Sequence, residues 1–169
     1  MSHDRDEVLQ RLFRTEEVVD PPDAVAGLFL RSHGHAIPGY PRHFVMWYLP
    51  PKGPAKPAAY VHHLPFGGVH LGGGMCADAA IYREMPGDAF RKARDAGGFA
   101  TMILRDTFTM LGDSAAVFGH VAEPRARQAD LRAGMRETGR EHLLVYWIRN
   151  LPEDEKQRIV ERVARHGPF

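Results

Sequence analysis

Histidines are the side chains with the greatest chemical capacity in this sequence, which contains ten of them in 169 residues. His62, His63, His70 and His120 lie in or beside stretches of apolar residues. An imidazole titrates near neutral pH, so each of the four is a candidate general base, and Asp78 is a further candidate. Packing in the core is the alternative role for every one of these side chains.

A metal site is the second chemistry that the histidines suggest, from His33 with His35 and from the group of His62, His63 and His70. Successive side chains of a strand point to opposite faces, which makes His62 and His63 poor partners for one ion. His62 and His70, from neighbouring strands, would share a face. Because these histidines lack the regular spacing of a metal motif, we expect no metal.

Gly97 and Gly98 form the third candidate feature, because they precede the most regular helical stripe in the sequence. The first N–H groups of a helix have no partner inside it, and glycines let an anion approach the backbone closely. The turn is therefore an anion site in principle. The alternative is that the glycines serve the turn geometry alone.

Apolar periodicity and breaker residues define the elements that must position these side chains. Helices are predicted over residues 4–14, from Pro22 to Gly34, and over 86–94, 98–111, 124–133 and 152–165; strands are predicted over 43–49, 58–64, 69–77, 115–121 and 141–148. Gly72, Gly73 and Gly74 inside a strand indicate a bulge or the close approach of another molecule. Strands that begin as a meander and continue with helical crossovers predict an α/β fold, with a mixed, largely antiparallel sheet flanked by helices on both faces.

The whole chain has the size and composition of one globular domain, residues 1–169. We divide it into N-terminal helices over 4–33, a sheet and helix region over 43–121, and a helix-strand-helix region over 124–167. A formal charge of +1 without a basic block argues against a nucleic-acid partner, and no apolar run is long enough to cross a membrane, so we expect neither partner. The charged N-terminus and the single cysteine, Cys76, indicate a cytoplasmic protein without disulfides. The glycine-rich strand or the terminal strand would each support a homodimer.

The order of elements resembles the GNAT-type N-acyltransferase superfamily, in which the helix after the fourth strand opens with a Q/R-x-x-G-x-G/A loop that binds the pyrophosphate of acyl-CoA. The run Asp-Ala-Gly-Gly-Phe-Ala from Asp95 to Ala100 fits that loop from its first glycine onward. Asp95 stands where the family has Gln or Arg, and Arg94 is adjacent. A carboxylate facing a pyrophosphate weakens binding by like-charge repulsion.

The resemblance implies a co-substrate, acetyl-CoA or another acyl-CoA, and a set of residues that bind it. The residues that would contact CoA are Met75, Cys76 and Ala77, which pair with the pantetheine amides, and Arg94, Gly97, Gly98, Phe99, Ala100 and Thr101, which hold the pyrophosphate. His120 falls where the strands of this fold separate to admit the acyl chain. Asp130 falls where many members carry the tyrosine that protonates the leaving thiolate, and Tyr82 is the nearest tyrosine that could replace it.

Three functional hypotheses follow from these features. The first is an acyl-CoA-dependent N-acyltransferase that acts on a primary amine of a small molecule or peptide, with Asp78 or a histidine as base and Tyr82 as acid. The second is a GNAT-like domain that has lost this chemistry and binds a small molecule or a partner, as Asp95 and Asp130 suggest. The third is a histidine-based metal-binding protein on a mixed sheet.

Overall fold

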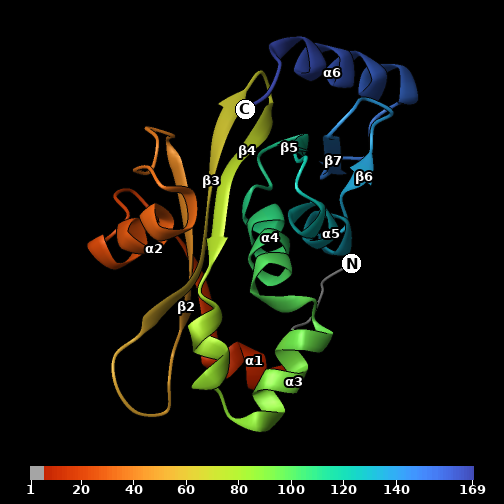
Figure 1. Ribbon diagram of the computed structural model, residues 1–169. Coiled ribbons are helices and arrows are strands. Elements are labelled where there is room, and N and C mark those ends of the chain that lie inside the picture. Colours follow the sequence, from red (N-terminus) through yellow and green to blue (C-terminus); the bar gives the residue numbers. More distant parts are fainter. Residues whose placement is uncertain (1–5) are drawn as a thin grey trace.

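A computed structural model describes residues 6–169 of the protein (Figure 1). Along the chain the elements are α1 (Glu7–Leu12), β1 (Phe13–Val18), α2 (Asp23–His33), β2 (Arg42–Tyr48), β3 (Lys56–Phe66), β4 (Val69–Ala77), the 3-10 helix η1 (Ala79–Arg83), α3 (Gly87–Asp95), α4 (Gly98–Met110), β5 (Ala116–His120), α5 (Pro124–Ala133), β6 (Arg136–Glu137), β7 (Leu143–Trp147) and α6 (Glu153–His166). No helix in this part of the chain is long and apolar enough to span a bilayer.

The strands form one seven-stranded sheet in the order β1-β2-β3-β4-β5-β7-β6. Every neighbouring pair is antiparallel except β4 and β5, which run parallel. A parallel pair needs a crossover connection, and α3 and α4 supply it. The prediction of a mixed, largely antiparallel sheet is therefore confirmed.

Helices cover both faces of this sheet, as predicted. Helices α1, α3, α4 and α5 share a core with one face, whereas α2 and α6 pack on the other face in two separate clusters. Figure 1 shows α2 and α4 on opposite sides of β3 and β4. Alternation along β3 illustrates the division, because Val61 points to the α4 core and Tyr60 to the α2 core.

The predicted first helix, residues 4–14, was partly wrong. Residues 4 and 5 lie outside the described residues, α1 ends at Leu12, and Phe13–Val18 is the strand β1. Phe13 enters the α4 core, and the indole of Trp47 on β2 donates a hydrogen bond to Glu16 at 2.8 Å. Pairing with β2 thus outweighs the helical periodicity of the segment. The two-residue strand β6 was also missed.

The glycines of β4 form the bulge that their sequence indicates. The register between β3 and β4 shifts between Val61 and His63, which leaves one additional residue on β4. A Cβ atom on Gly73 would lie 2.2 Å from Nε2 of His62, and one on Gly74 would lie 2.8 Å from the Phe29 ring. Glycine at both positions lets these two rings pack directly on the strand.

Candidate functional site

A cleft opens where β4 and β5 separate. The two strands pair over only three positions, from His70 with Val117 to Gly72 with Gly119. Beyond these pairs β4 continues to Ala77, whereas β5 ends at His120. The resulting cleft has a volume of about 240 Å³ and is lined by β4 and β5, by Leu104 and Phe108 of α4, and by Ala126 and Asp130 of α5.

Asp130 brings a buried carboxyl group to this cleft from the α4 side of the sheet. Its residue is 5% exposed, and Oδ2 lies 3.5 Å from the position that a Cβ on Gly119 would occupy. Among the described residues, no hydrogen bond or ion pair reaches the carboxyl group. Burial disfavours the charged form and raises the pKa of Asp130 to about 7.

His33 brings an imidazole to the same cleft from the C-terminal end of α2. Its Nε2 lies 2.9 Å from the Met75 carbonyl oxygen, and its ring stacks on Phe29 at a centroid distance of 4.3 Å. A carbonyl oxygen only accepts, so Nε2 carries the proton and a neutral ring keeps a lone pair on Nδ1. Sequence reasoning weighed His33 only for metal, because nothing local indicates that α2 docks beside Met75.

His62 and Tyr60 form a buried hydrogen-bonded chain behind the bulge. The Gly74 N–H donates to Nε2 of His62 at 2.9 Å, so Nδ1 carries the proton and faces the Tyr60 hydroxyl at 3.2 Å. That hydroxyl lies 2.7 Å from Nδ1 of His43. Burial lowers the pKa of His62 to about 4, so this ring is neutral and holds the bulge in place.

The prediction that His62 and His70 share one face of the sheet was wrong. A two-residue turn joins Phe66 to Val69, and this register puts His63, not His62, on the face of His70. The rings of His63 and His70 lie 6.5 Å apart, and Nε2 of His70 accepts from Arg42 at 3.3 Å. Within residues 6–169, no cluster of three or more possible metal ligands occurs.

Gly97 and Gly98 open α4, with φ values of 97° and 85° that favour glycine. The Tyr82 hydroxyl accepts a hydrogen bond from the Phe99 N–H at 3.0 Å, and the two rings stack at 4.0 Å. The Thr101 hydroxyl donates to the Gly97 carbonyl at 3.0 Å. Tyr82 therefore caps the start of α4 and occupies one of the N–H groups expected to face an anion.

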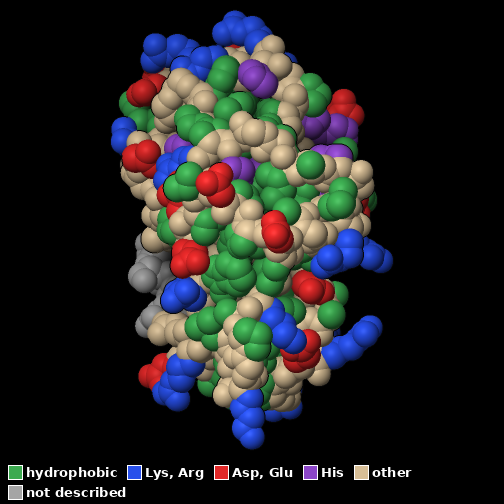
Figure 2. Space-filling view, turned by 90° about the vertical axis from the view of Figure 1, so that its left-hand side faces the viewer, with side chains coloured by type: hydrophobic (Ala, Val, Ile, Leu, Met, Phe, Trp, Pro, Cys, Tyr) green, Lys and Arg blue, Asp and Glu red, His purple; other side chains and the backbone are tan. Residues whose placement is uncertain are grey.

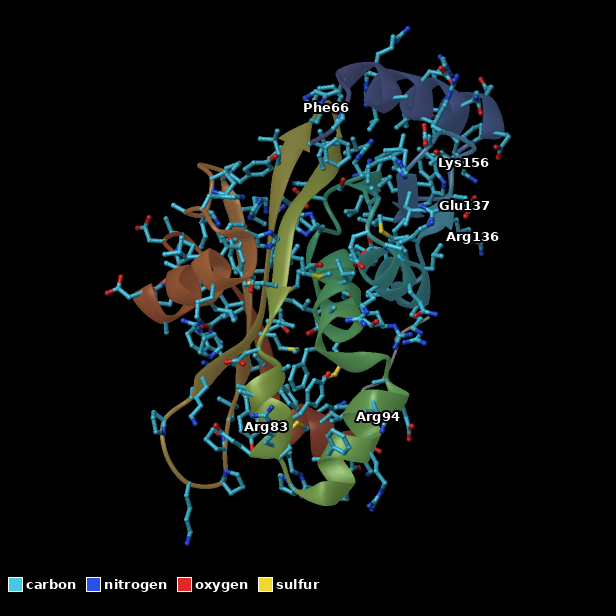
Figure 3. The ribbon with its side chains drawn as sticks, viewed as in Figure 1. Phe66, Arg83, Arg94, Arg136, Glu137 and Lys156 are labelled. Atoms are coloured by element: carbon cyan, nitrogen blue, oxygen red, sulfur yellow. The ribbon has the colours of Figure 1, made fainter. Side chains whose placement is uncertain are left out.

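Arginines surround this turn. A groove of about 550 Å³ is lined by Arg94, Asp95, Ala96, Gly97, Gly98, Arg105 and Arg132. Arg105 donates to the carbonyls of Ala96 and Arg132, at 3.1 and 2.7 Å, and so joins the ends of α3 and α5. Arg94 lies at the end of α3 (Figure 3). Three arginines outweigh the carboxylate of Asp95, so the groove is positively charged overall.

The remaining predicted site residues are spread over several environments. Asp78 caps η1 by accepting from the Ala80 N–H at 2.9 Å. Cys76 is buried on the α2 face, where burial raises the pKa of its thiol to about 11 and makes it a poor nucleophile. Ala77 is exposed at the end of β4. His120 lines the cleft, with its ring 6.1 Å from that of Phe169.

The folded chain is similar to solved N-acyltransferase structures. The ribosomal-protein-S18-alanine N-acetyltransferase from Escherichia coli is 10% identical, with 83% of this chain and 98% of that chain covered and a TM-score of 0.51. The chain has the fold of the GNAT-type N-acyltransferases. Searches with the sequence match no protein-family model and no curated protein.

Two further structures are similar to this GNAT fold at TM-scores below 0.5. One is a GNAT family acetyltransferase from Brucella melitensis in complex with acetyl-CoA, at 10% identity and a TM-score of 0.46, with 82% of this chain and 92% of that chain covered. The other is a KacTA–DNA complex, at 13% identity and a TM-score of 0.41, with coverages of 88% and 99%. Sequence identities this low support a shared fold and nothing about function.

Proposed function

We propose that the protein is an acyl-CoA-dependent N-acyltransferase that transfers an acyl group to a primary amine of a small molecule or peptide. The observation that carries this proposal is the separation of β4 from β5 beside α4, the helix that Gly97 and Gly98 open. The separation supplies a cleft for a thioester, and the turn supplies an anion site on the same side of the sheet.

In this proposal the pyrophosphate of the donor lies in the positively charged groove at the start of α4. Arg94 and Arg132 line the groove and form no ion pair with another described residue, so both are available to phosphate oxygens. A helix rises about 1.5 Å per residue, which places Gly98 roughly 9 Å along α4 from Leu104 at the cleft. The pantetheine arm would bridge this interval and reach the edge of β4 near Met75.

The acceptor amine would approach from the opposite face, which carries α2. Figure 2 shows that face, with histidines in its upper half. Nδ1 of His33 would take the proton from the amine as its nitrogen attacks the thioester carbonyl carbon. His120 is the alternative base at the cleft, whereas Asp78 and Tyr82 serve as caps and are not assigned a step.

Calorimetry with acetyl-CoA and CoA tests the donor site. We expect micromolar binding by the native protein and at least tenfold weaker binding by Arg132→Glu, because the change reverses a charge in the groove. Arg165→Glu makes the same change on α6, away from the groove, and is expected to bind as the native protein does. No detectable binding by the native protein at millimolar ligand would contradict the proposal.

Transfer is tested separately, by thiol release from acetyl-CoA with a panel of primary amines, peptide N-termini and hydroxylamine. Release that depends on an amine supports the enzyme. Binding of acetyl-CoA with no release for any amine would favour a GNAT-like module that binds CoA without catalysis. The panel also identifies the class of acceptor.

A further inference from the structure

The carboxyl group of Asp130 is unusual for its position. It lies on the second turn of α5, it is 5% exposed, and no described residue donates a hydrogen bond to it. A carboxylate without a partner in such surroundings is costly, whereas the neutral acid is tolerated. Burial of this carboxyl group therefore costs folding stability. The group lines the cleft that the donor's thioester would enter.

None of the charged and titratable groups around Asp130 offsets the effect of burial, so Asp130 is the best candidate for an acid in the cleft. Arg127, one turn earlier on α5, is the one charge that acts noticeably on it, and it lowers the pKa less than burial raises it. His33, His63, His120 and Glu123 line the same cleft. Burial keeps His63 neutral, and the Glu123 carboxylate is engaged by the Ala126 N–H at 2.7 Å.

We propose that the protonated Asp130 is the proton donor to the thiolate that leaves when the acyl group is transferred from CoA. The proposal rests on the N-acyltransferase function and adds a catalytic residue to it. Arg132, in the groove assigned to pyrophosphate, follows Asp130 by two residues on α5. Asp130 and one arginine of the groove thus lie on the same helix, on the α4 side of the sheet.

The step balances without a further reactant. The amine nitrogen forms a bond to the thioester carbonyl carbon and gives its proton to His33 or water. When the tetrahedral intermediate collapses, the C–S bond breaks and its electron pair stays on sulfur. The sulfur takes the proton of Asp130, which gives the CoA thiol and a carboxylate. Exchange with solvent then restores both groups.

The acidity of Asp130 suits this transfer. A pKa of about 7 leaves much of the carboxyl protonated at neutral pH. An alkyl thiol such as that of cysteine has a pKa of about 8.5, so the proton moves from the stronger acid to the more basic sulfur. Asp130 must be protonated to act, and the rate of transfer should therefore fall as pH rises through about 7.

Asp130→Asn tests the proposal with hydroxylamine as acceptor and acetyl-CoA as donor. We expect a roughly 100-fold lower kcat, an unchanged Kd for acetyl-CoA, and loss of the fall in kcat above pH 7. Asp154→Asn makes the same change on the surface of α6 and should leave all three quantities unchanged. An Asp130→Asn variant with native kcat and the native pH profile would overturn the assignment.

Infrared difference spectra provide a measurement that needs no acceptor. The native protein should show a protonated-carboxyl C=O band that titrates near pH 7 and is missing from Asp130→Asn, or from Asp130→Ser if the first variant fails to fold. Absence of such a band from the native protein overturns the inference. Failure of the native protein to bind acetyl-CoA rejects the proposed function, and the inference falls with it; binding with no thiol release also overturns the inference.

Discussion

At the scale of single residues, hydrogen bonds determine which ring nitrogen carries the proton in the histidines at and behind the cleft. The Met75 carbonyl oxygen requires a proton on Nε2 of His33, whereas the Gly74 N–H requires a bare Nε2 on His62. In the neutral ring, His33 therefore has a free lone pair on Nδ1, whereas His62 has none. This difference, and not the number of histidines in the sequence, selects His33 as the candidate base.

Replacement of His33 by glutamine separates orientation from basicity. The glutamine amide can still donate to the Met75 carbonyl, but it has no nitrogen that accepts a proton at neutral pH. We expect kcat for an amine identified by the panel to fall about 100-fold, with an unchanged Kd for acetyl-CoA. His35→Gln, two residues away on the same surface, is the control, and an equal loss in both variants would exclude His33 as the base.

Asp130 should also affect stability in a direction that depends on pH. Its folded pKa of about 7 exceeds the ordinary value of 3.8, so its contribution is fully present below pH 3.8 and is lost as pH rises to about 7. The unfolding free energy of Asp130→Asn, relative to that of the native protein, should rise by up to about 4 kcal/mol from pH 4 to pH 8. Urea unfolding at the two pH values measures this, and an equal difference at both would show that Asp130 has an ordinary pKa.

At the scale of elements, the bulge in β4 joins the two faces of the site. Gly73 and Gly74 admit the rings of His62 and Phe29 from the α2 side, and Met75 then points to the α4 core. Without the additional residue, every later side chain of β4 would change face. The bulge therefore determines which face of the sheet each later side chain of β4 points to, and with it the face on which we propose that the acyl donor binds.

Gly73→Ala should destabilise the fold, because the added methyl group would overlap the His62 ring at 2.2 Å. We expect a loss of about 1–3 kcal/mol in unfolding free energy, from urea denaturation. Gly87→Ala, at the start of α3, has nothing within 4 Å of its Cβ and should be neutral or slightly stabilising. If both variants are equally stable, the close packing of His62 on β4 is not present.

At the scale of the whole molecule, buried neutral histidines contribute to the loss of stability at acid pH. Burial lowers the pKa of His63 to about 3 and that of His62 to about 4, from an ordinary value of 6.5. The unfolded chain binds these protons more readily, so stability is present above pH 6.5 and is lost as pH falls toward 3. Both imidazole nitrogens of His63 are buried without a hydrogen-bond partner in the described part of the chain.

His63→Leu should reduce this sensitivity to acid. A leucine of similar size keeps the contact with Phe44 and removes the titrating group. The unfolding free energy of the variant minus that of the native protein should be about 2 kcal/mol larger at pH 5 than at pH 7.5, measured by urea unfolding at each pH. His166→Gln, at the exposed end of α6, should show no such difference. A His63→Leu protein as sensitive to acid as the native one would contradict the burial of this ring.

The sequence by itself determined most of the elements, the mixed sheet, the β4 bulge and the glycine-opened helix α4. These features arise from local periodicity and from residues with special backbone freedom, which can be read along the chain. It failed at β1 and β6, because the pairing of Phe13–Val18 with β2 lies outside any local pattern.

Only the tertiary structure decided which side chains meet at the cleft. His33 and Met75 are 42 residues apart, and the docking of α2 brings them together. The burial of Asp130 depends likewise on how α5 packs on α4, and the grouping of Arg94 with Arg132 depends on Arg105, which joins the ends of α3 and α5. Protonation and charge at a site depend on neighbours in space, which the linear sequence does not show. The sequence therefore predicted the fold, whereas the packing of the helices was needed to propose Asp130 as the acid and His33 as the base.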